Sequence, residues 1–215
     1  MTSPGRFYDA LYAKTVKRWP HENVVGFIER NREALRGRPV LDNGCGAGRH
    51  SIYMAQRGIR ALGIDVSRVA IQHARVWAER EAPSACFLVA DSAALPLSDA
   101  SMAGLISWEA MYYGDDKHVR RCVREALRVL QPGAPFLLLL KSKQDFRFER
   151  FERVSANTCA SEQGLMMSCF DRDELAELLR PGAVEVAIET LAHSLHDGRD
   201  MVWNFSITGH KERGS

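Results

Sequence analysis

Short apolar runs alternate along the chain with segments whose apolar positions recur at helical spacing. Apolar runs bounded by turn residues fit buried strands, whereas the amphipathic segments between them fit helices. The clearest helical pattern covers 119–130, where one side is apolar and the other carries arginines. The five runs that predict strands are 40–41, 59–64, 86–89, 102–107 and 135–140. Strands that alternate with helices are typical of a parallel sheet with helices on both faces.

The two ends of the chain extend this pattern. Apolar positions at helical spacing predict two helices within residues 1–38. After the fifth strand, a 30-residue connection at 141–170 leads to a helix and to two strands at 184–191 and 201–208, joined through 196–199. We expect a single α/β domain, a Rossmann-like seven-stranded sheet that is mostly parallel, with an antiparallel C-terminal strand pair and helices on both faces.

The stretch from Val40 to Gly48 joins the first strand to the following helix through a glycine-rich turn. Its sequence is Val-Leu-Asp-Asn-Gly-Cys-Gly-Ala-Gly. Glycine permits positive φ and close approach of a ligand, and the free N–H groups at a helix start favour electron-rich groups. The spacing G-x-G-x-G differs from the dinucleotide-binding G-x-G-x-x-G, because Arg49 stands where that pattern needs its third glycine. By itself the turn fits a structural role as well as a ligand site.

Two acidic residues follow the next two predicted strands. Asp65 ends the second strand, 17 residues after Gly48, where a carboxylate can accept hydrogen bonds from both hydroxyls of a ribose. Asp91 ends the third strand, where a carboxylate suits an exocyclic amino group, although it can also cap the following turn. The carboxyl ends of parallel strands form one edge of a sheet, so these residues predict a nucleoside-binding site there.

Three segments together resemble the successive cofactor motifs of the class I S-adenosylmethionine (SAM)-dependent methyltransferases. They are Val-Leu-Asp-Asn-Gly-Cys-Gly-Ala-Gly-Arg at 40–49, Gly-Ile-Asp-Val-Ser at 63–67 and Ala-Asp-Ser at 90–92. The chain is most similar to the small-molecule branch of that superfamily, over about residues 38–140. Asn43 departs from the pattern, since Leu or Val is usual there.

The resemblance implies SAM as cofactor, S-adenosylhomocysteine as product and a small molecule as methyl acceptor. It places the methionine part of SAM on the glycine turn, the ribose on Asp65 and the adenine on Asp91. The expected cofactor-binding residues are Asp42, Gly44, Cys45, Gly46, Gly48, Asp65, Val66, Ser67, Asp91, Ser92, Ala93 and Ser107.

The segment after the fourth strand, from Ser107 to Tyr113, should face the transferred methyl group. It lacks the motif of Asn or Asp followed by two prolines and an aromatic residue, which is found in many methyltransferases of nucleic-acid amines or protein glutamine, and this argues against those acceptors. It also offers no Asp-His or Cys-His pair for covalent catalysis, so direct transfer is expected. The candidate catalytic residues are Glu109, Tyr112, Tyr113 and His118.

Aromatic side chains are the candidates for binding the acceptor. The N-terminal helices either cover one sheet face or fold over the cofactor, and the 141–170 connection is either a mobile lid or a surface segment. The candidate substrate-binding residues are Tyr8, Tyr12, Trp19, Trp108, Tyr112, Tyr113 and Phe148.

Composition narrows the alternatives further. A chain of 215 residues with a net charge of +2 suits one domain and gives no strong attraction to nucleic acid or membrane. The chain has no apolar run long enough to span a membrane and no signal-like start. Five cysteines without a C-x-x-C spacing argue against disulfides and metal sites and favour the cytoplasm. We expect a monomer or homodimer.

The expected division of this single domain (1–215) follows from the motifs. Residues 1–38 form a helical cap, 39–140 the cofactor-binding core, 141–170 a candidate substrate lid, and 171–215 a helix with the antiparallel strands. An NAD(P)-binding oxidoreductase and a non-catalytic SAM-binding regulator remain as alternatives. Arg49, Asp91 and the antiparallel ending count against the oxidoreductase.

Overall fold

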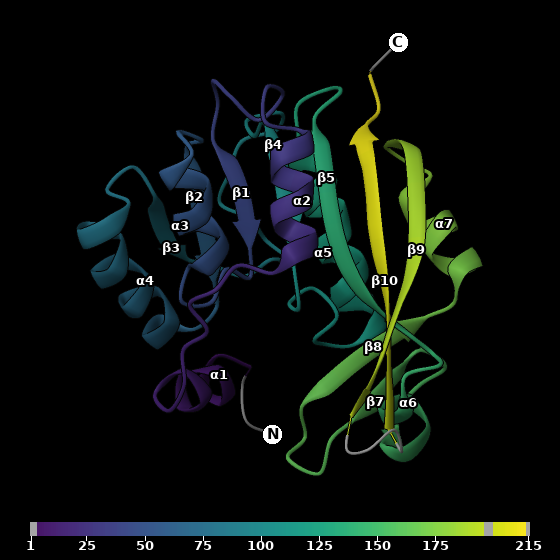
Figure 1. The fold of residues 1–215 in the computed structure, drawn as a ribbon. Helices are drawn as coiled ribbons and strands as arrows, with labels where there is room; N and C mark the ends of the chain where they lie inside the picture. Colours follow the sequence, from purple (N-terminus) through teal and green to yellow (C-terminus); the bar gives the residue numbers. More distant parts are fainter. Residues whose placement is uncertain (1–3, 196–199, 214–215) are drawn as a thin grey trace.

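Five parallel strands form the centre of the sheet (Figure 1). The computed structural model describes residues 4–195 and 200–213. The parallel strands lie in the order β3-β2-β1-β4-β5: β1 Val40–Asn43, β2 Ala61–Asp65, β3 Cys86–Val89, β4 Gly104–Ser107 and β5 Pro135–Ser142. The chain crosses from β3 back to β4 beside β1, and such a switch point is where open α/β sheets bind ligands.

The sheet continues beyond β5 with two long strands that run in opposite directions. β10 (Asp200–Lys211) pairs antiparallel with β5, and β9 (Ala183–Leu195) pairs antiparallel with β10. These seven strands confirm the predicted fold class, including its antiparallel C-terminal pair. The predicted turn at 196–199 lies outside the described residues.

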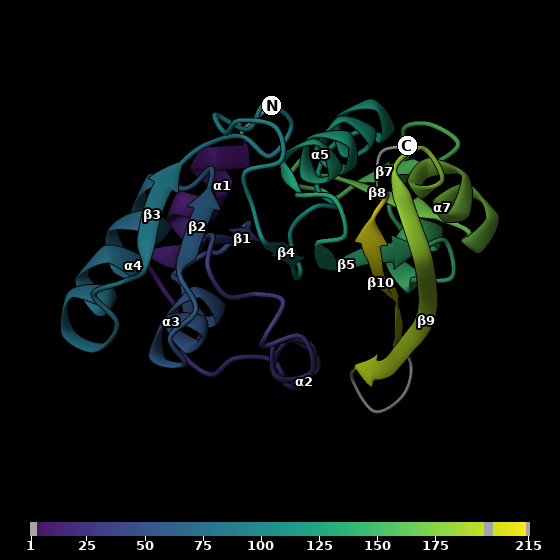
Figure 2. The same cartoon turned by 90° about the horizontal axis from the view of Figure 1, so that it is seen from above.

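Helices cover both faces of this sheet (Figure 2). α2 (Glu22–Arg30) and α3 (Arg49–Gln56) lie on one face, and α5 (Asp116–Val129) and α7 (Arg172–Leu179) lie on the other. α4 (Arg68–Glu81) packs against β2, β3 and α3. None of the described helices is long and apolar enough to cross a membrane.

The two N-terminal helices lie at different parts of the sheet. α2 buries Val24, Phe27 and Ile28 and covers the sheet, as one of the two predicted alternatives requires. α1 (Pro4–Tyr12) lies instead at the end of the sheet where the parallel strands have their carboxyl ends (Figure 1). Asp9 fastens α1 to the start of α4, since its Oδ1 accepts hydrogen bonds from Ser67 Oγ at 2.6 Å and Val69 N at 3.1 Å.

The 141–170 connection contains more regular structure than the sequence predicts. It forms α6 (Phe146–Arg150), β6 (Glu152–Arg153), β7 (Thr158–Ala160) and β8 (Met166–Phe170). β8 pairs in parallel with the last two residues of β5, and β7 and β6 follow it antiparallel. The described part of the chain thus has ten strands, and the prediction of seven was wrong in number. The three additional strands are short and depend on pairing with the end of β5, which no local pattern reveals.

Candidate active site

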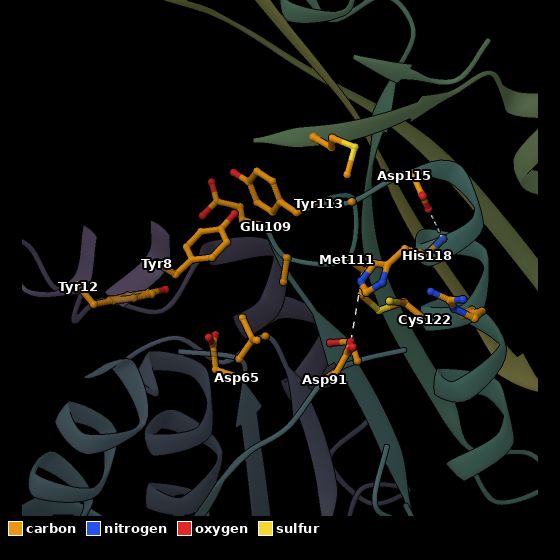
Figure 3. Close-up of a pocket in the computed structure, with 17 residues that line it drawn as sticks. Tyr8, Tyr12, Asp65, Asp91, Glu109, Met111, Tyr113, Asp115, His118 and Cys122 are labelled. Atoms are coloured by element: carbon orange, nitrogen blue, oxygen red, sulfur yellow. Dashed lines mark hydrogen bonds and ion pairs between the residues drawn. The ribbon is translucent and has the colours of Figure 1, made fainter. Parts of the chain in front are cut away.

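A cavity of about 360 Å³ lies between α1, the carboxyl ends of β1, β2 and β4, and the start of α5 (Figure 3). Gly44 and Asp65 line it from the ends of β1 and β2, and Asp91 lines it from the segment after β3. Tyr8 and Tyr12 of α1 lie across the cavity from Asp65 (Figure 3). The three sequence motifs therefore meet at one cavity, and α1 supplies its opposite wall.

The glycine turn is held in place by its own backbone. Gly44 N and Cys45 N both donate to Ile64 O at 2.8 Å, and Gly46 N donates to Asp65 Oδ2 at 2.8 Å. Gly44 has φ +77°, and an added Cβ would lie 2.1 Å from Ala110 Cβ. The close approach of Gly44 to Ala110 therefore requires glycine. Within the described part of the chain, the Gly44 carbonyl accepts no hydrogen bond, so it is free to bind a ligand.

Asp65 is the most buried of the carboxylates that line this cavity. Its Oδ1 accepts a hydrogen bond from Ser67 N at 2.9 Å, and its Oδ2 is bound by Gly46 N. Burial raises the pKa of Asp65, while these backbone N–H groups oppose the shift. Each oxygen keeps a second lone pair, so the carboxylate can still accept the hydroxyl groups of a ribose.

Asp91 is more open. Its carboxylate is 55% exposed, Oδ1 accepts a hydrogen bond from Ala93 N at 2.8 Å, and His118 Nε2 lies 3.9 Å from Oδ1. The carboxylate, the His118 imidazole and the Cys122 sulfur lie within 4.8 Å of one another, a spacing that can hold a metal ion. The sequence predicts no metal here. The carboxylate that adenine would need is one of these three groups, so the two uses compete for it.

Asn43, the departure from the family pattern, braces the floor of the cavity. It is fully buried, and its Oδ1 accepts a hydrogen bond from Ser92 Oγ at 2.6 Å. Its Nδ2 lies 3.3 Å from Met111 Sδ, and its carbonyl accepts from Ser107 Oγ at 2.9 Å. The polar side chain thus ties the end of β1 to the segments that follow β3 and β4.

Glu109 lies where three cavities meet. It has φ +60°, which is unusual for a residue with a side chain and typical of functional loops. Its carboxylate is 3.0 Å from Arg49 and 3.2 Å from Lys17. Burial raises the pKa of Glu109, but these two cations outweigh it and hold the pKa below its ordinary value. The group is therefore an anion at neutral pH and a weak base.

Two of the tyrosines near Glu109, Tyr8 and Tyr112, remain protonated. Burial, together with the neighbouring Tyr113, raises the pKa of Tyr8 and of Tyr112 well above the ordinary value. The rings of Tyr112 and Tyr113 lie 4.5 Å apart, and Tyr8 meets Tyr113 edge-on at 5.3 Å. Tyr8 Oη is buried and has no hydrogen-bond partner among the described residues, so it can donate to a bound ligand.

Two further cavities adjoin the first at Glu109 and Tyr113. The smaller, of about 210 Å³, reaches along the glycine turn to Arg49. The larger, of about 360 Å³, extends toward β5, β10 and the 141–170 connection. A cofactor and a second molecule can therefore meet beside Glu109.

Several expected cofactor residues support the cavities without lining them. Asp42 is buried beneath the turn, where Ser51 N and Ser51 Oγ donate to its Oδ2 at 3.0 and 2.7 Å, and burial raises its pKa to about 6. Ser67 caps α4. Val66 and Ser92 line the first cavity, and Cys45 lines the smallest. Those that line none of the three cavities around Glu109 are Asp42, Gly46, Gly48, Ser67, Ala93 and Ser107.

Three of the aromatic candidates lie elsewhere than expected. Trp19 is 85% exposed and borders a shallow depression beside Arg49, apart from the three cavities that meet at Glu109. Phe148 is buried beneath the Arg153 guanidinium, which lies 3.5 Å from the ring centroid, and it lines none of the three cavities around Glu109. Trp108 is buried against His21 and reaches only the smallest cavity. Packing explains the places of Phe148 and Trp108, whereas Trp19 lies at the surface.

Sequence reasoning missed most of the larger neighbouring cavity. Lys141, Arg147 and Asn204 line it, together with residues of the 141–170 connection. One signal was present in the sequence, because Lys141 and Asp145 stand four apart at the carboxyl end of a buried strand. His118, a candidate base, lines the first cavity beside Asp91 rather than beside Glu109 (Figure 3).

Comparisons with known proteins agree with this geometry. Residues 40–133 match the model of a methyltransferase domain. An O-methyltransferase of Aspergillus nomiae is 32% identical over 116 residues, which are 53% of this chain and 51% of that protein. A 2-heptyl-1-hydroxyquinolin-4(1H)-one methyltransferase of Mycobacteroides abscessus is 30% identical over 129 residues, 59% of this chain and 55% of that protein. The chain spans about half the length of the curated relatives it matches.

The fold agrees over a longer stretch than the sequence does. A SAM-dependent methyltransferase structure from Methanosarcina mazei superimposes with a TM-score of 0.68 at 20% identity, covering 91% of this chain and 100% of that one. At that identity the likeness shows the fold alone. Together with the matched domain, which contains the glycine turn, Asp65 and Asp91, it supports the class I SAM-dependent methyltransferase superfamily for this chain.

Proposed function

We propose that this protein transfers a methyl group from SAM directly to a small-molecule acceptor and releases S-adenosylhomocysteine. The observation that supports this most is that Gly44, Asp65 and Asp91 line one cavity, which opens at Glu109 onto a second cavity of similar size. Family and fold imply the use of SAM. The relative that methylates a hydroxyquinolone supports a small-molecule acceptor.

The first cavity and the adjoining cavity of about 210 Å³ have side chains that suit the parts of SAM. We propose that Asp65 binds the ribose hydroxyls and Asp91 the adenine amino group, with Val66 against the adenine ring. The free Gly44 carbonyl suits the ammonium of the methionine part, and Arg49 suits its carboxylate. The unpartnered Tyr8 Oη supports the presence of a polar ligand at this place.

When bound, SAM supplies an electrophilic methyl group on a sulfonium. The task of the protein is then to hold an acceptor in line with it and to keep water away. Tyr112 and Tyr113 line both adjoining cavities, the smaller one along the glycine turn and the larger one toward β5. The π faces of their rings suit a neighbouring positive charge. Tyr8 and Tyr12 close the cofactor cavity from the side of α1.

Proton removal is a smaller part of this proposal. Glu109 is ionised but paired with two cations, and Tyr112 holds its proton firmly. Neither is a strong base at neutral pH, so positioning should provide most of the acceleration. We propose the same domain division as above: residues 1–38 as helical cap, 39–140 as cofactor-binding core, 141–170 as substrate lid, and 171–215 as the C-terminal helix with the antiparallel strands.

Label transfer from methyl-labelled SAM to a panel of oxygen, nitrogen and sulfur acceptors tests this function. We expect transfer in the native protein, and measurable turnover in Glu109→Gln and Tyr112→Phe. A residue that acts as a base contributes on the order of 10² to 10⁴ to the rate, so neither substitution should abolish it. Glu33→Gln, at an exposed position far from the cavities, is the control.

The configuration at a chiral methyl group should invert once. Retention would instead require a double displacement through an enzyme nucleophile and would contradict direct transfer. A protein that binds S-adenosylhomocysteine but transfers label to no acceptor would point to the regulator instead.

A further inference from the structure

The cavity that adjoins Glu109 on the side of β5 has a polar end and apolar walls. Tyr112, Leu139, Phe151 and Met167 are among the apolar and aromatic residues that form the walls. The polar side chains of Lys141, Arg147 and Asn204 also line it. A volume of about 360 Å³ is in the range of small-molecule sites.

Lys141 and Arg147 share one buried carboxylate. Lys141 Nζ lies 2.8 Å from Asp145 Oδ2, and an Arg147 Nη lies 3.1 and 3.2 Å from the two oxygens of the same group. Asp145 is completely buried and also accepts a hydrogen bond from Trp203 N at 3.2 Å. Two cations around a single anion leave one positive charge in excess at the cavity wall.

That excess charge is unusual for so enclosed a place. Lys141 is only 4% exposed, and within the described chain its Nζ makes one hydrogen bond, so N–H groups remain free. Burial lowers the pKa of Lys141, and the Asp145 carboxylate opposes the shift. A second anion beside Nζ would stabilise the charged form further, since a buried charge is costly unless it is paired.

Asn204 supplies an independent sign of a missing ligand. It stands directly opposite Lys141 in the antiparallel pairing of β10 with β5, so the two side chains are neighbours. Asn204 is 7% exposed, and its Oδ1 is buried without a hydrogen-bond partner among the described residues. The amide can turn so that Nδ2 donates to a ligand instead.

We propose that this cavity binds the methyl acceptor and that the acceptor is an aromatic molecule with a carboxylate, held by Lys141, Arg147 and Asn204. That the bound molecule is the methyl acceptor rests on the proposed methyl transfer. The preference of this cavity for an aromatic acid does not depend on it. Tyr112 contacts both ends, since its ring lies 5.3 Å from Lys141 Nζ and 4.5 Å from the Tyr113 ring. The carboxylate would bind at Lys141, and the nucleophile would lie toward Glu109 and Tyr113.

A structural role alone, in which Lys141 and Asp145 only hold α6 against β5, explains fewer of these observations than an anion site does. It explains why Asp145 is buried and caps α6. It explains neither the second cation on the same carboxylate nor the unpartnered Asn204 oxygen.

Binding of 4-hydroxybenzoate and 4-hydroxybenzamide, measured by calorimetry with and without saturating S-adenosylhomocysteine, tests the proposal. At pH 7 the two probes have nearly the same shape and differ in the charge of one group. We expect the acid to bind at least about tenfold more tightly than the amide. In Lys141→Met and in Arg147→Gln the preference should fall to about twofold or less, because either change removes the excess charge.

Lys143→Met is the matched control. Lys143 is two residues from Lys141, pairs with Asp171 and Glu174 instead, and does not line the cavity, so the preference should persist. Arg147→Gln changes a side chain that is 27% exposed, whereas Lys141 is only 4% exposed, so it decides the matter even if Lys141→Met fails to fold.

Equal affinity for acid and amide in the native protein, or no binding of either up to about 10 mM, would overturn the proposal. A preference that survives in Arg147→Gln would do the same, whether or not Lys141→Met folds. Titration of S-adenosylhomocysteine alone separates this result from the proposed function. If S-adenosylhomocysteine fails to bind while the acid still binds more tightly than the amide, the proposed methyl transfer is contradicted. The anion site at Lys141 and Arg147 is then still supported.

Discussion

Gly44→Ala should weaken S-adenosylhomocysteine binding by more than about 100-fold, or about 2.7 kcal/mol. The new Cβ would lie 2.1 Å from Ala110 Cβ, and the residue would have to keep φ +77°. A left-handed backbone costs a non-glycine residue about 1 to 2 kcal/mol, and overpacking costs about 1 to 3 kcal/mol more. Gly44 and Ala110 both line the proposed cofactor cavity, so relief of the clash must deform it.

Gly58→Ala separates the two contributions. Gly58 has φ +76°, nearly the same as Gly44, but a Cβ there would meet nothing within 4 Å. This control should lose stability through the backbone alone and retain its affinity for S-adenosylhomocysteine. Calorimetry and thermal unfolding of both variants would measure the two effects. Native affinity in Gly44→Ala would mean that the ligand binds elsewhere.

Asp65→Ala should weaken S-adenosylhomocysteine binding by more than about tenfold, or about 1.4 kcal/mol, because the two charge-assisted hydrogen bonds proposed between Asp65 and the ribose would be lost. Asp65→Asn keeps the shape and one acceptor oxygen, so its affinity should lie between the native protein and Asp65→Ala. The structure adds a second reason for the loss, since Gly46 N and Ser67 N would lose their acceptor.

Asp99→Ala is the control for the loss of a carboxylate. Asp99 is exposed and pairs with Arg128, away from the cavities. Calorimetry should show unchanged affinity in this variant. Unchanged affinity in Asp65→Ala as well would remove Asp65 from the site and with it the assigned alignment of the motifs.

The cavity proposed for the cofactor could be predicted from the sequence because its residues follow from local rules. The glycine turn, Asp65 and Asp91 each follow a strand, and parallel strands place their carboxyl ends at one edge. The supporting role of Asp42 is less evident. An acidic residue before the glycines suits a ligand, yet its carboxylate is used by Ser51 beneath the turn.

The acceptor side depends on contacts between distant segments. β8 forms because the end of β5 offers it partners at Lys141 and Ser142, and the long β10 brings Asn204 beside Lys141. No periodicity in 141–170 reveals such pairing. Trp19 and Phe148 show the same limit of sequence-based prediction for residues that were expected at the site. Aromatic character alone does not distinguish an exposed or packed ring from one at a ligand site.

Titration of the native protein with S-adenosylhomocysteine and, separately, with NADH tests the central claim most directly. The arrangement of Gly44, Asp65 and Asp91 predicts saturable one-to-one binding of S-adenosylhomocysteine and no binding of NADH, since Arg49 stands in place of the third glycine of a dinucleotide site. Saturable binding of NADH with no response to S-adenosylhomocysteine would contradict the proposed cofactor and the methyl transfer that depends on it.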